Sequence, residues 1–121
     1  MNCEKKVIPH YSSFLKVKDG ETIYISGQLP INPQSKEPIS KELKEQVRFA
    51  LKKMEDIIKT QGGNRFHIVK TVAYTNDISN WEAINEVYSE FFGEYKPTRT
   101  IVSVKEIHFG VQVEIEGVAV I

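Results

Sequence analysis

The stretch Lys96-Pro97-Thr98-Arg99-Thr100-Ile101-Val102 is followed, after a short gap, by Val113-Glu114-Ile115-Glu116-Gly117-Val118-Ala119-Val120. Both runs are rich in β-branched residues, so they predict two strands, from about Thr98 to Val104 and from Val111 to Ile121. The first strand opens with an arginine, which can bind a carboxylate through two parallel hydrogen bonds. The second carries Glu114, a carboxylate that could hold and deprotonate a water.

Three earlier segments also have the composition of strands. Phe14–Val17 and Thr22–Ser26 flank the turn Asp19-Gly20, which predicts a hairpin. Phe66–Thr75 is rich in β-branched residues and predicts a further strand. With a helix on either side of this last strand, the predicted order of elements is ββαβαββ.

Two helices are predicted between these strands. Ser40 is a candidate N-cap for the first, and Gly62-Gly63 supplies a left-handed stop. The second is predicted to begin with a capping box at Ser79–Glu82, with Ile78 placed to pack on Ala83. The first helix has one apolar stripe, formed by Leu43, Val47, Ala50, Leu51, Met54 and Ile58.

Length and charge limit the possible functions. A chain of 121 residues predicts one domain spanning residues 1–121, with a frayed polar start at residues 1–8. Sixteen basic and sixteen acidic side chains cancel, which argues against a general nucleic-acid or membrane-surface binder. The single cysteine, Cys3, allows no intrachain disulfide and is expected to be a bystander. No secretory signal or membrane-length apolar run is found, so a cytoplasmic location is expected.

The ββαβαββ order predicts an α+β or α/β sandwich in which a mixed sheet carries two helices. We take the α+β form, with both helices on one face. Ile23-Tyr24-Ile25 and Val118-Ala119-Val120-Ile121 are nevertheless apolar at successive positions, as in strands covered on both faces. Two helices on one face leave the other face uncovered. We therefore expect a second copy of the chain to cover it.

Five motifs in this order resemble those of the RidA (YjgF-type) family, and the resemblance runs from about Pro9 to Ile121. They are Ser26-Gly27-Gln28-Leu29-Pro30, Val69-Lys70-Thr71-Val72 with Thr75-Asn76-Asp77, Ile84-Asn85-Glu86-Val87-Tyr88 with Phe91-Phe92-Gly93-Glu94, Lys96-Pro97-Thr98-Arg99, and Val113-Glu114-Ile115-Glu116.

The resemblance implies a chorismate-mutase-like fold and a homotrimer with a cleft between each pair of subunits. It implies hydrolysis of 2-imino acids, such as 2-iminobutanoate and 2-iminopropanoate, to 2-oxo acids and ammonia, with no cofactor. Arg99 would then bind the carboxylate and Glu114 would orient the water. The substrate-binding residues would be Tyr11, Ser26, Gly27, Asn85 and Ile101, the last of these offering its backbone.

The sequence departs from the family pattern at three places. Pro9-His10-Tyr11-Ser12 replaces Gly-Pro-Tyr-Ser, and Ser13-Phe14-Leu15 replaces a start of the Gln-Ala type. Ile107-His108-Phe109-Gly110 replaces Leu-Pro-Lys-Gly before the last strand. Because these segments border the expected cleft, the resemblance leaves the preferred imino acid undefined.

The two proposed catalytic residues also have ordinary structural explanations. Arg99 could form a surface or interface ion pair. Glu114 alternates with apolar neighbours, so it could lie beside Glu116 on a solvated sheet face. In a buried strand or interface, by contrast, its carboxylate would need a partner.

The binding residues have comparable alternatives. Ser26 and Gly27 could simply end a strand, and Tyr11 could be a packing residue. Asn85 could tie its helix to nearby backbone.

Two other functions remain open at this stage. One is a non-catalytic sensor that binds 2-oxo acids through Arg99. The other, disfavoured by the zero net charge, is an activity on RNA. His10, His67 and His108 lack metal-like spacing, so no metal site is expected.

Overall fold

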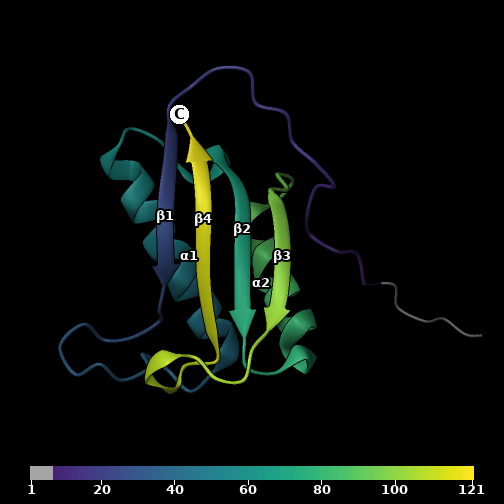
Figure 1. Cartoon of the computed structure of the whole chain (residues 1–121). Coiled ribbons are helices and arrows are strands. Elements are labelled where there is room, and N and C mark those ends of the chain that lie inside the picture. The colour runs from purple at the N-terminus through teal and green to yellow at the C-terminus, as the bar shows by residue number, and fades with distance from the viewer. Residues whose placement is uncertain (1–6) are drawn as a thin grey trace, which may run out of the picture.

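The structure, a computed structural model, describes residues 7–121. One mixed sheet runs through it in the order β1–β4–β2–β3 (Figure 1). Strand β4 pairs antiparallel with β1 and with β2, whereas β2 and β3 are parallel. The strands are β1 (Thr22–Gln28), β2 (Ile68–Thr75), β3 (Thr98–Ser103) and β4 (Val113–Val120).

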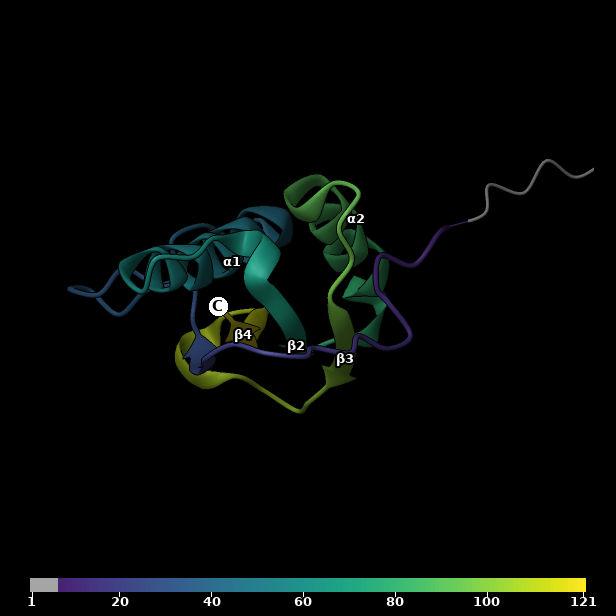
Figure 2. The same cartoon turned by 90° about the horizontal axis from the view of Figure 1, so that it is seen from above.

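Two helices, α1 (Leu43–Thr60) and α2 (Trp81–Phe92), cover the same face of this sheet (Figure 2). The predicted stripe of α1 packs on the sheet, and its Val47, Leu51 and Met54 have no exposed surface. Close packing here depends on Gly117 of β4, since a Cβ at this position would lie 2.3 Å from the Met54 methyl carbon. The α+β architecture with both helices on one face is therefore confirmed.

The end of α1 follows the predicted glycine stop. The Gly62 N–H donates to the Lys59 carbonyl and the Gly63 N–H to the Ile58 carbonyl, which is the Schellman pattern. Gly62 has a φ of +86°, a value that residues with a Cβ rarely adopt.

The predicted helix starts were less accurate. Ser40 does not cap α1, which begins at Leu43; its hydroxyl accepts from the Glu42 N–H in the preceding turn. The capping box at Ser79 is wrong as well. Asp77 instead accepts from the Ser79 N–H and opens a short 3-10 helix, Ile78–Asn80, that leads directly into α2.

The predicted strand at Phe14–Val17 is absent, so the described order of elements is βαβαββ. The Ser12 N–H donates to the Pro97 carbonyl beside β3, whereas Glu21 pairs with Ile121 beside β1. These two anchors lie at opposite edges of the sheet (Figure 1), so the residues between them cross its width. Residues 13–20 are needed to span the distance between the two edges, so they cannot also pair with β1 as a strand.

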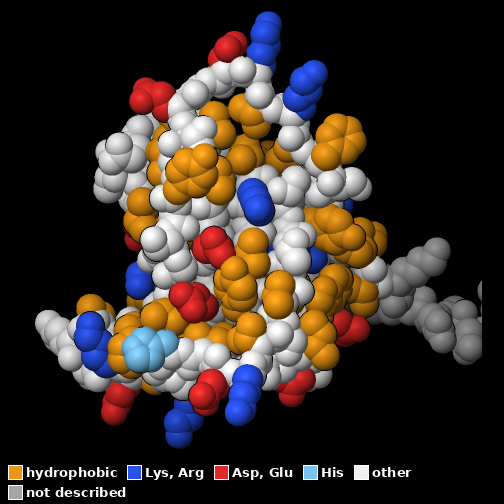
Figure 3. All heavy atoms as spheres, viewed as in Figure 1, with side chains coloured by type: hydrophobic (Ala, Val, Ile, Leu, Met, Phe, Trp, Pro, Cys, Tyr) orange, Lys and Arg blue, Asp and Glu red, His pale blue; other side chains and the backbone are white. Residues whose placement is uncertain are grey.

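The sheet face opposite the helices is open. Tyr24 on this face is 82% exposed, while Ile23 and Ile25 on the same strand point toward the helices. Figure 3 looks onto the open face and shows hydrophobic side chains gathered over the strands around a few charged ones. The uncovered face is confirmed, and its coverage by another copy stays a prediction.

Two sequence predictions concern residues near the start of the chain. Cys3 lies outside the described residues, as does most of the predicted frayed start at residues 1–8. Within residues 7–121, no helix is long and apolar enough to cross a bilayer.

Candidate functional site

Arg99 lies at the start of β3, opposite Thr71 in the parallel pairing with β2. Thr71 is fully buried and its hydroxyl shares a hydrogen bond with the Tyr88 hydroxyl of α2. The Thr71 side chain, and that of its register partner Arg99, therefore lie on the helix side of the sheet. Side chains alternate along a strand, so Arg99 and Ile101 both point to the helix side.

Three aromatic rings surround the Arg99 guanidinium. Its central carbon, Cζ, is 5.2 Å from the Tyr11 ring centre, 5.3 Å from Trp81 and 5.0 Å from Tyr88. Ring faces attract a cation at such distances. Burial lowers the pKa of Arg99 from its usual value, although a guanidinium remains charged at physiological pH. Burial also raises the pKa of Tyr88 to about 12, so its hydroxyl stays neutral.

Asn85 of α2 holds one side of this guanidinium. Its Oδ1 accepts from Arg99 Nη1 at 3.0 Å and from the His10 N–H at 2.6 Å. The His10 carbonyl accepts from the same Nη1 at 3.4 Å. Within residues 7–121, no hydrogen bond is made by Arg99 Nε or Nη2. These donors can therefore bind a ligand carboxylate.

Tyr11, Asn85 and Arg99 were predicted from the sequence as site residues, but the rings of Trp81 and Tyr88 were not. Trp81, Asn85 and Tyr88 are spaced i, i+4 and i+7, which puts them on one face of α2. The same spacing is typical of an ordinary core stripe. Only the position of Arg99 opposite that face of α2 distinguishes a binding site from an ordinary core stripe.

Glu114 lies on β4, opposite Tyr74 of β2 and beside the irregular end of β1. A Cβ at Gly27 would lie 2.1 Å from Glu114 Oε2, so the missing side chain at Gly27 leaves room for this carboxylate. Ser26, Gly27 and Glu114 line a cavity of about 390 Å³, together with Tyr74 and Glu116.

Glu116 lines the same cavity but already has a partner. The Tyr74 hydroxyl donates to Glu116 Oε1, and this bond raises the pKa of Tyr74. No hydrogen bond or ion pair to Glu114 is found in the described part of the chain. Of these two carboxylates, Glu114 is the one whose oxygens are available to a water.

The predicted site residues therefore form two groups. The arginine half-site consists of Tyr11, Asn85, Arg99 and Ile101. The glutamate half-site consists of Ser26, Gly27 and Glu114. Arg99 points to the helix side of the sheet, whereas Glu114, paired with Tyr74, points to the open side. One chain alone does not bring the two half-sites together.

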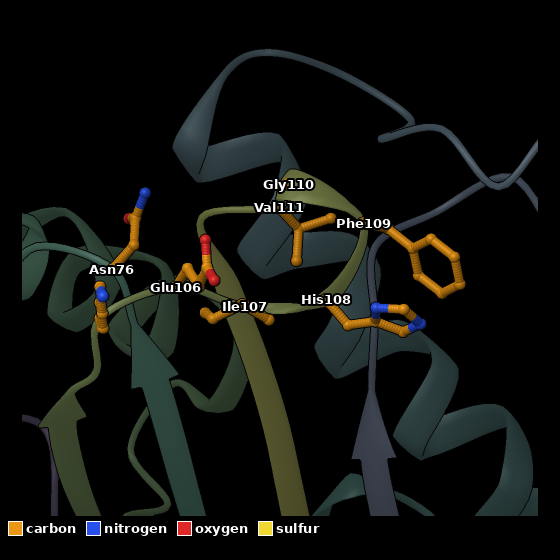
Figure 4. A pocket seen from close by; sticks show the side chains of 8 residues that line it. Asn76, Glu106, Ile107, His108, Phe109, Gly110 and Val111 are labelled. Atoms are coloured by element: carbon orange, nitrogen blue, oxygen red, sulfur yellow. The ribbon is translucent and has the colours of Figure 1, made fainter.

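A larger cavity, of about 520 Å³, lies at the connection between β3 and β4 (Figure 4). It is lined by Asn76 and by residues 105–111, and none of the predicted site residues lines it. Glu106, Ile107 and His108 also line the cavity of the glutamate half-site. One segment that departs from the family pattern thus forms a wall beside Glu114.

The same segment contains a strained residue. Phe109 has a φ of +64°, in the left-handed region that is uncommon for bulky side chains. Its ring lies 3.7 Å from that of His108, centre to centre. No cluster of three or more metal-ligating side chains occurs among residues 7–121.

Comparison with known proteins places this geometry in a family. Residues 3–121 match the family described as Endoribonuclease L-PSP. The chain belongs to the YjgF/RidA family. This confirms the resemblance inferred from the five sequence motifs.

Family relatives are similar over most of their length. A RutC family protein of Pyrococcus abyssi is 36% identical over 114 residues, which cover 94% of this chain and 88% of that protein. The 2-iminobutanoate/2-iminopropanoate deaminase of Homo sapiens is 36% identical over 99 residues, 82% of this chain and 72% of the human one. The crystal structure of Escherichia coli TdcF with bound serine superimposes with a TM-score of 0.76 at 31% identity, covering 97% of this chain and 99% of TdcF.

Proposed function

We propose that this YjgF/RidA protein hydrolyses 2-imino acids of the 2-iminobutanoate and 2-iminopropanoate type to 2-oxo acids and ammonia. The observation that carries the proposal is the arginine half-site: a half-buried guanidinium whose Nη1 is held by Asn85 while Nε and Nη2 make no hydrogen bond within residues 7–121. The similarity to the human 2-iminobutanoate/2-iminopropanoate deaminase gives further support.

Arg99 would bind the substrate carboxylate through its two free donors. Asn85 and the three rings fix the plane of the guanidinium before the substrate arrives, which reduces the entropy lost on binding. The rings also keep water from competing for the cation. The backbone of Ile101, two residues further on the same strand, would orient the ligand beside Arg99.

Glu114 would act on the imine carbon. It accepts one proton from a water whose oxygen bonds to that carbon and passes it to the nitrogen, so that the carbon–nitrogen double bond becomes the single bond of a tetrahedral intermediate with a hydroxyl and an amino group. Glu114 then moves the hydroxyl proton to the amino group as the carbon–nitrogen bond breaks, which releases ammonia and leaves a carbonyl. Such acid–base catalysis supplies about two to four powers of ten in rate, and the orientation of the substrate adds to it.

The two half-sites lie on opposite sides of the sheet, so the proposal requires at least two copies. Arg99 of one subunit would meet the open face of the next, where Glu114 lies. Such an interface joins two different patches, and an interface of this kind closes into a ring when the rotation between neighbouring subunits divides a full turn evenly. We propose a ring of three, as the sequence resemblance implies, in which the exposed apolar residues around Tyr24 become buried.

Substitution of Arg99 tests the proposal. Imines generated in place by a threonine or serine dehydratase would be followed by ammonia release. We expect Arg99→Ala to lose about ten- to a hundredfold or more in kcat/KM, because a charge-assisted bidentate pair is removed. Arg99→Lys should also be poor, since an ammonium lacks the planar fork. Arg48→Ala, on the outer face of α1, is the matched control. Undiminished activity of Arg99→Ala would overturn the proposal.

A sensor is the second candidate, and the serine bound in the TdcF crystal structure is the observation that favours it. A sensor would bind 2-oxobutanoate through Arg99 without turnover. Calorimetry with 2-oxobutanoate, run beside the ammonia assay, separates the two functions. An activity on RNA would instead persist in Arg99→Ala.

A further inference from the structure

His10 is the buried histidine of a segment that forms one wall of the arginine half-site. We call residues 8–12 the N-terminal strap. The His10 side chain is only 5% exposed, and its Nε2 lies 2.9 Å from the Tyr95 carbonyl oxygen. A carbonyl can only accept, so Nε2 carries the proton. The ring is thereby anchored to the connection between α2 and β3.

The backbone of His10 contacts the guanidinium that the ring helps to place. Its N–H donates to Asn85 Oδ1, the atom that also accepts from Arg99 Nη1, and its carbonyl accepts from Nη1 directly. Asn85 in turn donates to the Ile8 carbonyl at 3.0 Å. Movement of His10 would therefore displace both acceptors of Nη1. It would also displace Tyr11, the next residue, whose ring covers the guanidinium.

The surroundings of His10 disfavour a second positive charge. Lys96 faces it from the α2–β3 connection and Arg99 faces it from β3. Burial, followed by these two cations, lowers the pKa of His10 from its usual 6.5, and the Tyr95 carbonyl opposes the shift. Folding thus favours the neutral ring. The contribution of the neutral His10 ring to the stability of the fold is complete above about pH 6.5 and is lost as the pH falls toward the lowered pKa.

We propose that His10 is a positioning residue for Arg99: its ring, bonded to the Tyr95 carbonyl, holds the strap on α2 and so keeps the acceptors of Arg99 Nη1 in place. The inference rests on the proposed carboxylate-binding role of Arg99 and deepens it. It also gives a physical role to one departure from the family pattern, in which a proline stands at this position.

The test compares three variants by the dissociation constant of 2-oxobutanoate at pH 8, where this ligand is an anion. His10→Ala should bind about three- to tenfold more weakly at pH 8, the effect of one lost hydrogen bond. His10→Gln places an amide N–H near the former Nε2, so it should restore the wild-type affinity. His67→Gln, on another part of the fold, should bind 2-oxobutanoate as wild type does.

A second measurement needs no ligand. The Arg99 Nε–H signal in a ¹⁵N NMR spectrum should shift from wild type to His10→Ala and should return to the wild-type position in His10→Gln. If wild type binds no 2-oxobutanoate but the Arg99 signal shifts in His10→Ala, the proposed function fails and the positioning role stands. If the Arg99 signal and the affinity of His10→Ala match those of wild type, the inference about His10 is wrong.

Discussion

At the scale of single residues, Gly27 and Glu114 depend on each other. A Cβ at Gly27 would fall 2.1 Å from Glu114 Oε2, the far end of a flexible side chain, so Gly27→Ala should move the carboxylate and leave the fold intact. We expect kcat for imine hydrolysis to fall by about ten- to a hundredfold, the range that a displacement of about 1 Å produces. A melting curve like that of wild type would show that the fold is kept. Unchanged kcat would mean that the position of Glu114 is unimportant.

The two carboxylates on the open face of β4 allow a matched comparison. Glu114→Gln should lower kcat by about two to four powers of ten, because an amide cannot accept the proton of water. Glu116→Gln should change it by less than about tenfold, since the amide oxygen can still accept from the Tyr74 hydroxyl. Ammonia release from a generated imine measures both. Equal losses in the two variants would contradict the assignment.

At the scale of elements, an ion pair joins α1 to the turn before β2. Arg65 Nε and Nη2 each donate to the Glu55 carboxylate at 2.8 Å, and Arg65 Nη1 donates to the Phe91 carbonyl of α2. Glu55 is only 3% exposed. Arg65→Met should therefore lower the free energy of unfolding by about 2–4 kcal/mol at pH 7, since it removes both charge-assisted hydrogen bonds of a buried carboxylate and leaves it only Lys59, whose Nζ lies 3.9 Å away. Chemical denaturation measures this change.

The same pair predicts a dependence on pH. The hydrogen bonds from Arg65 lower the pKa of Glu55 from 4.5, so the pair stabilises the fold above that pH and loses its effect as the pH falls toward the lowered pKa. Below that range, Arg65→Met and wild type should differ less in stability. Asp56→Asn, which breaks the exposed pair with Lys52, is the control and should cost under about 0.5 kcal/mol. A constant difference between pH 3 and pH 7 would argue against the pair.

Elements set by local signals were predictable from the sequence. The end of α1 at Gly62-Gly63 needs only a left-handed residue, and the apolar stripe of α1 needs only helical spacing. The start of α2 was missed because Asp77 begins a 3-10 turn, so the capping residue lies two positions earlier than Ser79. Phe14–Val17 has the composition of a strand, but pairing depends on where distant anchors hold its two ends.

At the scale of the whole molecule, the half-sites on opposite sheet faces make a direct prediction. Arg99→Ala and Glu114→Gln subunits should each be inactive alone. Assembled together in equal amounts, they should recover about one quarter of wild-type activity, because a quarter of the interfaces in a ring join two intact half-sites. Co-expression of the two variants, followed by the ammonia assay on the whole mixture, measures the recovery. No recovery would place both residues of a working site in one chain.

Most residues of the site could be predicted from sequence motifs, but their division into two half-sites on opposite faces of the sheet could not. The motifs identified Tyr11, Asn85, Arg99, Gly27 and Glu114 without showing on which side of the sheet each one points. That side follows from strand register, Arg99 against Thr71 and Glu114 against Tyr74, which is a long-range property. Trp81 and Tyr88 were missed because their neighbours across the fold, rather than their spacing, give them their role.

The placement of Arg99 and Glu114 on opposite sides of one sheet has a consequence for how activity scales with protein concentration. If each reaction centre needs a neighbour, turnover per subunit is constant in concentrated solution and declines on dilution, once subunits separate. The open face around Tyr24 then governs catalytic output as well as assembly. Weakening that contact would switch off turnover in every subunit while all of its reacting groups remained unaltered.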